Sequence, residues 1–489
     1  MRVTTTAQLV CGAALALGLS ACGPLKQAPQ EPVSVAQGPS EEPADTPSAK
    51  EPETSPPAEP ATGIVAKAST SAYPVEARNV RLVRTGEDQL ALQFELYNGM
   101  QEPLAPSLLG IDLREQHLAL VDPPRGTAYG LLQAADYDGR ISTNTEDSIP
   151  AGESATITAM FPAPPKETRE MLVGIGGMLP VVAPVLPAGD ASLQDDPVVS
   201  GPRGEPRTGP LICKVGGGGG AQAPVEFRLP SDVLFAFGKA SLSPAAKAAI
   251  AEVGQRITAD SGKIVIEGHT DAIGTDAAND ALSRQRATAV ADALRATVGT
   301  GFTYTVKGYG EAKPIAPNTR PDGSDNPDGR AQNRRVEVLV ETAGAKAELA
   351  ERAGDTKTLS DSGFKLNVQE VKRYAGYVLA KATVTNPTDQ PLDLDYVNAI
   401  SPREITLGQL SFVDKTAQRR HELCAFAEPT YFDFIGNFGQ TFWPDRLGTV
   451  PPGAEVVMWG LFAAPKAGTK QVDVEMGGYA ETLPADITD

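Results

Sequence analysis

The chain of 489 residues is short of the residue types that build metal and catalytic centres. It has three histidines and four cysteines, without the His/Cys spacing of a zinc site, and aromatic residues make up only 6%. Basic residues are also scarce, because 43 lysines and arginines stand against 61 aspartates and glutamates, a formal charge of -18. This balance argues against nucleic acid or an anionic membrane surface as a partner. We expect no cofactor and no metal.

Long apolar runs are missing except at the start. Beyond residue 22 no segment has 18 or more successive apolar residues, so no membrane-spanning helix is predicted. Residues 1–22 carry Arg2 and the apolar run Leu9–Leu19, the pattern of an export signal. The run ends in Leu-Ser-Ala-Cys, which resembles the bacterial lipobox and implies lipidation of Cys22. An ordinary secretory signal that contains a cysteine is the alternative.

Lipid on Cys22 would anchor the mature chain at a membrane. Gly23 follows in place of the aspartate that holds lipoproteins at the inner membrane of two-membraned bacteria. We therefore expect the outer membrane, facing the periplasm, or the outer face of the cytoplasmic membrane in a host with a single membrane. In either place Cys213 and Cys424 either form a disulfide or remain two thiols.

Composition divides the chain into segments. A Pro/Glu-rich tract predicts an extended stalk, and a Gly/Pro-rich tract that contains Gly216–Gly220 predicts a flexible linker. A phosphate loop is excluded there because no Gly-Lys-Ser/Thr follows the glycines. The expected segments are signal peptide 1–22, stalk 23–71, β-sandwich 72–185, linker 186–223, central domain 224–342, linker 343–360 and β-sandwich 361–489.

The two segments that flank the central domain look like copies of one another. In each, an alternating strand ends at Asn98 or Asn386, and a later Pro-Gly turn, Pro150–Gly152 or Pro451–Gly453, opens another strand. Short alternating strands punctuated by turns predict antiparallel β-sandwiches. They are similar to the immunoglobulin-like modules of bacterial surface lipoproteins.

These sandwiches offer no convincing ligand site. His117 and His421 stand alone, and a lone histidine is usually a structural residue. The aromatic stretch Tyr431–Pro444 favours a packed loop, and a surface for a protein or glycan partner is the alternative. In that alternative the sandwiches are adaptors for another envelope protein.

The central domain alternates strands and helices. Strands are expected through Val233, Phe235 and Phe237 and over 262–270, 302–310 and 333–341. Helices are expected from Ser243-Pro244, with Ser243 as N-cap, and over 275–297. Strands separated by helices imply βαβ units in a mixed sheet, so the predicted fold class is multidomain α+β.

Four stretches of this domain carry a resemblance: DVLFAFGKASLSPAA, IEGHTDAIGTDAANDALSRQRATAVADAL, VKGYGEAKPIAPN and GRAQNRRVEV. In order and spacing they resemble the OmpA C-terminal domain family, shared with peptidoglycan-associated lipoproteins. The resemblance implies non-covalent binding of peptidoglycan through the diaminopimelate of its stem peptide. It also implies a role in tethering membrane to cell wall.

Diaminopimelate ends in an ammonium and a carboxylate, and the resemblance implies a partner for each. Asp271 would accept hydrogen bonds from the ammonium, and Arg286 would offer its planar fork to the carboxylate. Asn279 lies two helical turns before Arg286 and would add a hydrogen bond. The alternative is that Asp271 and Arg286 only pair with each other.

Three further residues belong to the expected surroundings of this site. Ala236 stands where the family usually has a polar residue, so only its backbone could serve, and Arg334 is a secondary contact. His269 is expected to pack or hydrogen-bond beneath the binding loop.

Two other kinds of site have little support. Asp322, Asp325 and Asp328 lack the EF-hand spacing and closing glutamate of a calcium loop, so a solvated acidic loop is expected. Ser283 and His269 share the central domain, yet no oxyanion-hole motif or lytic-enzyme signature accompanies them. The sequence predicts a non-catalytic envelope protein, with a peptidoglycan hydrolase as the less favoured alternative.

Overall fold

The computed structural model describes residues 63–109, 111, 118–133, 148–189, 191–200, 204–217, 225–255, 257, 261–298, 300–342, 363–393, 410–427, 432–434, 449–476 and 482–489. The predicted signal peptide with Cys22, the predicted linker 343–360, His117, Tyr431 and residues 435–444 lie outside this description. In the described part of the chain, no helix is long and apolar enough to cross a bilayer.

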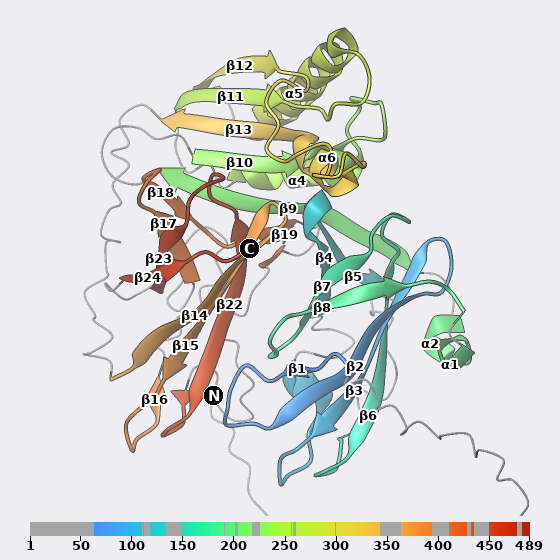
Figure 1. Cartoon of the computed structure of the whole chain (residues 1–489), viewed down its shortest axis with the longest axis vertical. Coiled ribbons are helices and arrows are strands. Elements are labelled where there is room, and N and C mark those ends of the chain that lie inside the picture. The colour runs from blue at the N-terminus through green and yellow to red at the C-terminus, as the bar shows by residue number, and fades with distance from the viewer. Residues whose placement is uncertain are drawn as a thin grey trace, which may run out of the picture. The chain divides into compact units, whose positions relative to one another are not determined.

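The central domain is a mixed sheet covered by helices. Its strands lie side by side in the order β10 (Val225–Pro230), β13 (Arg335–Thr342), β11 (Gly262–Gly268) and β12 (Phe302–Gly308) (Figure 1). The helices are α3 (Ser231–Leu234), α4 (Pro244–Gln255), α5 (Asp276–Val298) and α6 (Pro327–Asn333). β11 and β12 are parallel and joined through α5, whereas β13 is antiparallel to β10 and β11. The predicted βαβ unit and mixed sheet are confirmed.

Side-chain alternation explains the packing of this domain. Val336 and Val338 on β13 are fully buried in a core shared with Val253 of α4 and Val290 of α5. Ser243 caps α4 as predicted, since its hydroxyl accepts a 3.0 Å hydrogen bond from the amide of Ala246. The sheet and its two long helices therefore follow the pattern of the sequence.

The strand predicted through Val233, Phe235 and Phe237 is wrong. Residues 231–234 form the short helix α3, in which the amide of Phe235 donates to the carbonyl of Ser231 at 2.9 Å. Phe235 is buried, but Phe237 is 95% exposed, so these residues do not share one face. The true strand is β10, which ends at Pro230.

The first flanking region packs two sheets around one core. Its strands are β1 (Ala66–Lys67), β2 (Val75–Arg84), β3 (Gln89–Asn98), β4 (Leu118–Asp122), β5 (Thr127–Gln133), β6 (Ser154–Pro162), β7 (Glu170–Ile175) and β8 (Val181–Leu186), with 3-10 turns η1 (Pro106–Leu109) and η2 (Pro123–Arg125). Phe94 of the β2-β3-β6 sheet and Leu120 and Val173 of the β4-β7 sheet are buried together. β8 pairs with β7 in antiparallel and with β2 in parallel orientation, so the pairing is not entirely antiparallel.

The predicted boundaries of this region need correction. Residues 63–71, assigned to the stalk, are packed: Ser69 and Thr70 are buried, and β1 pairs with β2. The predicted linker 186–223 contains α1 (Ala191–Gln194), α2 (Pro197–Ser200) and the 13-residue strand β9 (Glu205–Gly217). Gly216 and Gly217 lie in that strand, opposite Arg420 and Arg419. A glycine run therefore does not exclude a strand when neighbouring strands pair with it.

The second flanking region repeats this plan. Its strands are β14 (Lys365–Tyr374), β15 (Tyr377–Thr385), β16 (Leu392–Asp393), β17 (Leu410–Asp414), β18 (Arg419–His421), β19 (Ala425–Ala427), β20 (Phe432–Phe434), β21 (Thr449–Val450), β22 (Glu455–Ala463), β23 (Gln471–Met476) and β24 (Thr482–Asp486). The sheet β14-β15-β22 and the strands β17 and β23 enclose a core that includes Val384, Phe412 and Val474. The immunoglobulin-like assignment of both regions stays a prediction.

Matching hydrogen bonds support the internal repeat. Asn98 is fully buried, and its Nδ2 donates to the carbonyls of Glu102 and Ile149, both at 2.8 Å. Asn386 is also fully buried and donates to two carbonyls four and 64 residues along the chain, again at 2.8 Å. The backbone oxygens of both asparagines accept from the glycine of the predicted Pro-Gly turn, Gly152 or Gly453. One asparagine in each region therefore makes equivalent hydrogen bonds to two equivalent turns.

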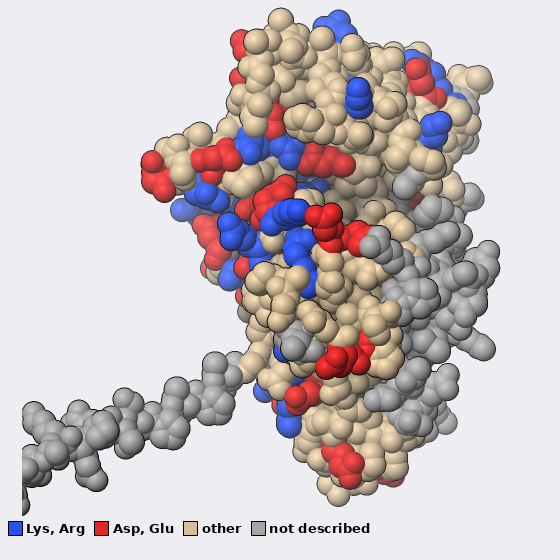
Figure 2. All heavy atoms as spheres, turned by 90° about the vertical axis from the view of Figure 1, so that its right-hand side faces the viewer, with Lys and Arg blue, Asp and Glu red and all other residues tan. Residues whose placement is uncertain are grey.

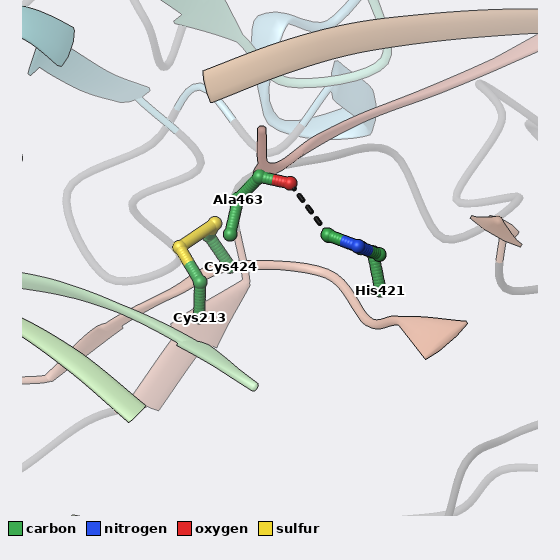
Figure 3. The surroundings of a disulfide bond; sticks show 4 residues. All are labelled: Cys213, His421, Cys424 and Ala463. Atoms are coloured by element: carbon green, nitrogen blue, oxygen red, sulfur yellow. Dashed lines mark hydrogen bonds between the residues drawn. A yellow bond between two sulfur atoms is a disulfide. The ribbon is translucent and has the colours of Figure 1, made fainter. Parts of the chain in front are cut away.

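β9 connects the parts of the chain that lie on either side of it in sequence. It pairs with β5, β10, β18 and β19. A disulfide joins Cys213 of β9 to Cys424, with their Cα atoms 4.1 Å apart (Figure 3). Beside it, Nδ1 of His421 donates to the carbonyl of Ala463 at 2.7 Å. Both cysteines are buried in a core to which the first region contributes Leu172 and the second contributes Trp459 and Leu461.

Candidate functional site

The predicted site residues come from separate parts of the central domain and meet at one edge of its sheet. Asp271 follows β11, Asn279 and Arg286 lie on α5, and Arg334 connects α6 to β13. Backbone hydrogen bonds fix this edge: the amide of His269 donates to the carbonyl of Arg335, and the amide of Thr270 donates to the carbonyl of Gly310, each at 2.9 Å.

Two glycines allow α5 to lie close against the strand ends. A Cβ atom on Gly268 would stand 2.1 Å from the carbonyl oxygen of Ser283. One on Gly308 would stand 2.6 Å from both the amide of Arg284 and the hydroxyl of Ser283. Only glycine permits this approach, which brings Asn279 and Arg286 to the loop that carries Asp271.

Asp271 is a buried carboxylate that is held from several directions. Its Oδ1 accepts the amide N–H of Ile273 at 3.2 Å, and its Oδ2 accepts from Nη1 of Arg334 at 2.6 Å. Nε of Arg330 lies 3.8 Å from the same Oδ2. Asp271 is only 8% exposed, so these partners must stabilise its negative charge in place of water.

Arg334 divides its guanidinium between two carboxylates. It forms a bidentate pair with Asp232 of α3, Nε to Oδ1 at 2.7 Å and Nη2 to Oδ2 at 2.6 Å, and its remaining Nη1 binds Asp271. Burial lowers the pKa of Arg334, but its hydrogen bonds to Asp232 and Asp271 outweigh burial and raise that pKa overall. Arg334 is therefore a permanent cation at the centre of this cluster.

Asn279 connects the helix to the loop that carries Asp271. Its Nδ2 donates to the backbone carbonyl of Asp271 at 3.3 Å and to Oε2 of Glu311 at 2.6 Å. Asn279 is buried and lies seven residues before Arg286, so both side chains project from the same face of α5.

Arg286 is a buried guanidinium with partners of a different kind. Its Nε donates to the backbone carbonyl of Lys239 at 3.0 Å, and its carbon Cζ lies 5.2 Å from the ring centre of Phe235. Burial lowers its pKa, which the negative charges of Asp232 and Asp271 oppose and the positive charge of Arg334 reinforces. These charges place Arg286 in the same electrostatic cluster, although Asp271 makes its ion pairs with Arg334 and Arg330.

The hypothesis that Asp271 and Arg286 merely neutralise each other therefore finds no support among the described contacts. Ala236 is exposed, and its carbonyl already accepts the amide of Lys239 at 2.9 Å, within the loop that also holds Arg286. The backbone of Ala236 thus shapes that loop.

The domain's sequence matches the OmpA family over residues 234–327. These residues form an OmpA family domain. Over 119 residues the chain is 47% identical to photosystem I P700 chlorophyll a apoprotein A2 of Gloeobacter violaceus, covering 24% of this chain and 14% of that protein. Over 122 residues it is 39% identical to outer membrane protein P5 of Haemophilus influenzae, covering 23% of this chain and 33% of that protein.

The chain therefore spans less than half the length of either relative. Among solved structures, the peptidoglycan-associated lipoprotein from Burkholderia pseudomallei is 29% identical, with a TM-score of 0.18, over 22% of this chain and 87% of that one.

His269 of the OmpA family domain is buried and packed, as expected. It is 1% exposed and stacks on Tyr309 with ring centres 5.5 Å apart. Its pKa falls to about 3, first because of burial and then because of Arg335, Lys313 and Arg228, so the ring is neutral at pH 7.

Glu267, His269 and Glu337 bring three potential metal-ligand atoms within 4.8 Å of one another. However, Lys307 lies 3.1 Å from Glu267 and Arg335 lies 2.6 Å from Glu337, so protein cations already neutralise both carboxylates. We therefore assign this cluster a structural role.

The acidic loop of the domain follows the expected solvated pattern. Oδ1 of Asp322 accepts the amide of Ser324 at 2.9 Å, and Asp325 forms an ion pair with Arg330. The amide of Gly329 completes the loop by donating to the side chain of Asn326 at 3.2 Å, which caps α6.

In the second flanking region, His421 is a structural histidine whose Nδ1 is hydrogen-bonded to the carbonyl of Ala463.

Sequence reasoning missed Asp232 and Glu311 at this site. Asp232 was hidden because the surrounding residues resemble a strand, and Glu311 follows β12 without a motif of its own. On the face in Figure 2, Lys and Arg side chains lie among Asp and Glu side chains in a band across the molecule. That face therefore carries charges of both signs side by side in this band.

Proposed function

We propose that this protein binds peptidoglycan non-covalently through its OmpA family domain, with Asp271 and Arg286 holding the ammonium and carboxylate of diaminopimelate. The observation that carries the proposal is the state of Arg286. Its guanidinium is buried, yet its contacts are a peptide carbonyl and a phenyl ring, and no carboxylate among the described residues lies in ion-pair contact with it.

A ligand carboxylate would supply the partner that this guanidinium lacks. A planar guanidinium matches a carboxylate with two parallel hydrogen bonds, and such pairs are stronger than bonds between neutral groups. Asp271, held by Arg334 and by the amide of Ile273, can accept a further donor such as an ammonium. The two charges suit a zwitterion, and Asn279 holds the backbone carbonyl of Asp271 in place.

The test is co-sedimentation of the purified protein with peptidoglycan sacculi that contain diaminopimelate. Asp271→Asn and Arg286→Ala should each lose retention, by at least about tenfold, because each removes a charge-assisted contact in a buried site. Asp292→Asn and Arg295→Ala are matched controls, since these residues form an exposed 2.6 Å ion pair on the same helix. Circular dichroism must show that the variants are folded, because breaking buried ion pairs can destabilise a domain.

The two outcomes that contradict the proposal are distinct. If Asp271→Asn and Arg286→Ala sediment with sacculi as the wild type does, the ligand contacts are elsewhere. If incubation releases soluble muropeptides, the protein is a hydrolase and the assignment of a non-catalytic role fails. Sacculi of lysine type, in which the stem peptide lacks the second zwitterionic end, test the diaminopimelate specificity.

In this proposal the remaining parts of the chain connect the wall to a membrane. Cys22 carries the lipid, the stalk gives reach, and the flanking β regions act as spacers or as adaptors for another envelope protein. The name of the relative outer membrane protein P5 supports an outer-membrane location. Metabolic labelling with a fatty acid, lost in Cys22→Ser, would test the anchor.

A further inference from the structure

Asp232 and Asp271 compete for one guanidinium. Asp232 takes the bidentate edge of Arg334, at 2.7 and 2.6 Å, and leaves a single nitrogen for Asp271. A guanidinium prefers the two-bond arrangement with a carboxylate. The direction in which this fork points therefore decides how completely Asp271 is neutralised before a ligand arrives.

The backbone holds Asp232 in this position. The amide of Ser231 donates to the carbonyl of Arg334 at 2.9 Å, and α3 closes with the bond from Phe235 to Ser231. The helix that carries Asp232 is thus attached to the chain segment that carries Arg334. Ser231 is fully buried and Asp232 is exposed, so the contact between Asp232 and Arg334 lies on the solvent side of the cluster.

Without Asp232, the fork of Arg334 would be free to rotate onto Asp271. Oδ2 of Asp271 already accepts from Nη1, and Arg330 lies 3.8 Å from the same oxygen. A bidentate pair there would occupy the carboxylate that the proposed function needs for an ammonium. The negative charge of Asp232 itself also favours a cation at this position.

We infer that Asp232 is a positioning residue: it keeps the bidentate edge of Arg334 turned away from Asp271, which receives only Nη1, and so keeps Asp271 able to accept the ammonium of a zwitterionic ligand. The inference rests on the proposed function and deepens it. It assigns the ammonium end of the ligand to three hydrogen-bonded residues, Asp232, Arg334 and Asp271. Asp232 needs no contact with the ligand in this role.

The experiment is calorimetric titration of the full chain with two probes. The first is an N-acetylmuramoyl tripeptide that ends in diaminopimelate, and the second is the same compound acetylated on the diaminopimelate amine. Asp232→Asn should weaken binding of the first probe about tenfold, the size expected for loss of a charged hydrogen-bond partner, without weakening the second. Asp232→Glu, which keeps the carboxylate, should recover most of the affinity.

Asp276→Asn is the matched control, because Asp276 is an exposed acid in the first turn of α5. It removes the same charge without a contact to Arg334 and should leave both affinities unchanged. The inference is overturned if Asp232→Asn binds the first probe as the wild type does, if it weakens both probes equally, or if Asp276→Asn has the same effect. Failure of the proposed function would be seen separately, because Asp271→Asn and Arg286→Ala would then still sediment with sacculi.

Discussion

The two flanking β regions share a frame but differ on one face. Counting from the equivalent residues Asn98 and Asn386, Ala91 corresponds to Leu379. Counting from Gly152 and Gly453, Thr158 corresponds to Trp459, and Met160 to Leu461. In the first region this face is small and partly polar, and Nε2 of Gln93 donates to the hydroxyl of Thr158 at 3.0 Å. In the second, Leu379, Trp459 and Leu461 make it larger and mostly apolar, although Lys381 stands at the position of Gln93.

What covers each face explains the difference. In the first region, Leu193 of α1 packs with Ala91 and Met160 in a small separate core. In the second, Trp459 and Leu461 are buried against residues of the first region and of β9. The repeat therefore conserves the inner core and turns, while the outer face is adapted to what packs on it. A residue's contribution to the free energy of unfolding should therefore depend more on what packs against it than on its position in the repeat.

The largest predicted contrast is between Trp459 and its counterpart Thr158. Trp459 is 6% exposed, and its Nε1 donates to the carbonyl of Met178 in the first region at 3.1 Å. Trp459→Ala should cost about 3–5 kcal/mol of unfolding free energy, as for other buried tryptophans. Thr158→Ala should cost about 1 kcal/mol, for the loss of the buried hydrogen bond from Gln93. Urea denaturation measures both, and equal effects would contradict the comparison.

The shared frame makes the opposite prediction. Asn98→Ala and Asn386→Ala each remove two donated hydrogen bonds and leave two carbonyls without those donors. Each should cost about 2–4 kcal/mol, since buried polar groups without partners are expensive. The two costs should agree within about 1 kcal/mol, the usual scatter of such values. A larger gap in denaturation experiments would mean that the two turns are not equivalent.

Local pattern predicted much of the fold, and distant contacts account for the rest. The alternation of Val336 and Val338, the cap at Ser243 and the two asparagines are local signals, and the structure confirms them. The strand β9 was missed because its partners are supplied by distant segments. Periodicity likewise gives no information on which face Trp459 covers, because Met178 lies 281 residues away.

Prediction of the site from the sequence has the same limit, at the level of single side chains. Motif spacing brought Asp271, Asn279 and Arg286 into one proposed site. In the structure the charge of Asp271 acts on Arg286, and Asn279 donates to the backbone carbonyl of Asp271. Spacing did not reveal that Arg334 would hold Asp271, because that depends on the rotamer of an arginine and on the helix at Asp232. Which of these residues contacts the ligand stays a prediction.

Acid should open the second region before the first. His421 pairs opposite Phe412 in β17 as Tyr129 pairs opposite Leu120 in β4. Burial, opposed by the hydrogen bond to Ala463, lowers the pKa of His421 from 6.5 to about 4. Below pH 6.5 the unfolded state therefore binds a proton that the folded state does not, and stability falls until about pH 4, by up to about 3 kcal/mol. Tyr129, whose pKa is raised by burial, stays neutral over this range.

Hydrogen-exchange protection factors give the necessary local measurement. Those of β17 and β18 should fall between pH 6.5 and 4 more than those of β4 and β5, and His421→Gln should remove the difference. A local probe is needed because His269, with its lowered pKa, adds the same sign of dependence in the central domain. Equal loss in both regions would contradict the assignment to His421.

The smallest contrast concerns one hydroxyl in each region. Thr168 donates to Oδ2 of Asp122 at 2.8 Å, and Thr469 donates to Oδ2 of Asp414 at 3.1 Å. Thr168 is 5% exposed, whereas Thr469 is half-buried, so water can replace the second hydroxyl but not the first. Thr168→Val should cost about 1–2 kcal/mol and Thr469→Val about 0.5 kcal/mol. If the order is reversed in denaturation experiments, burial is not what distinguishes equivalent positions of the repeat, and the argument from cover fails at its most local test.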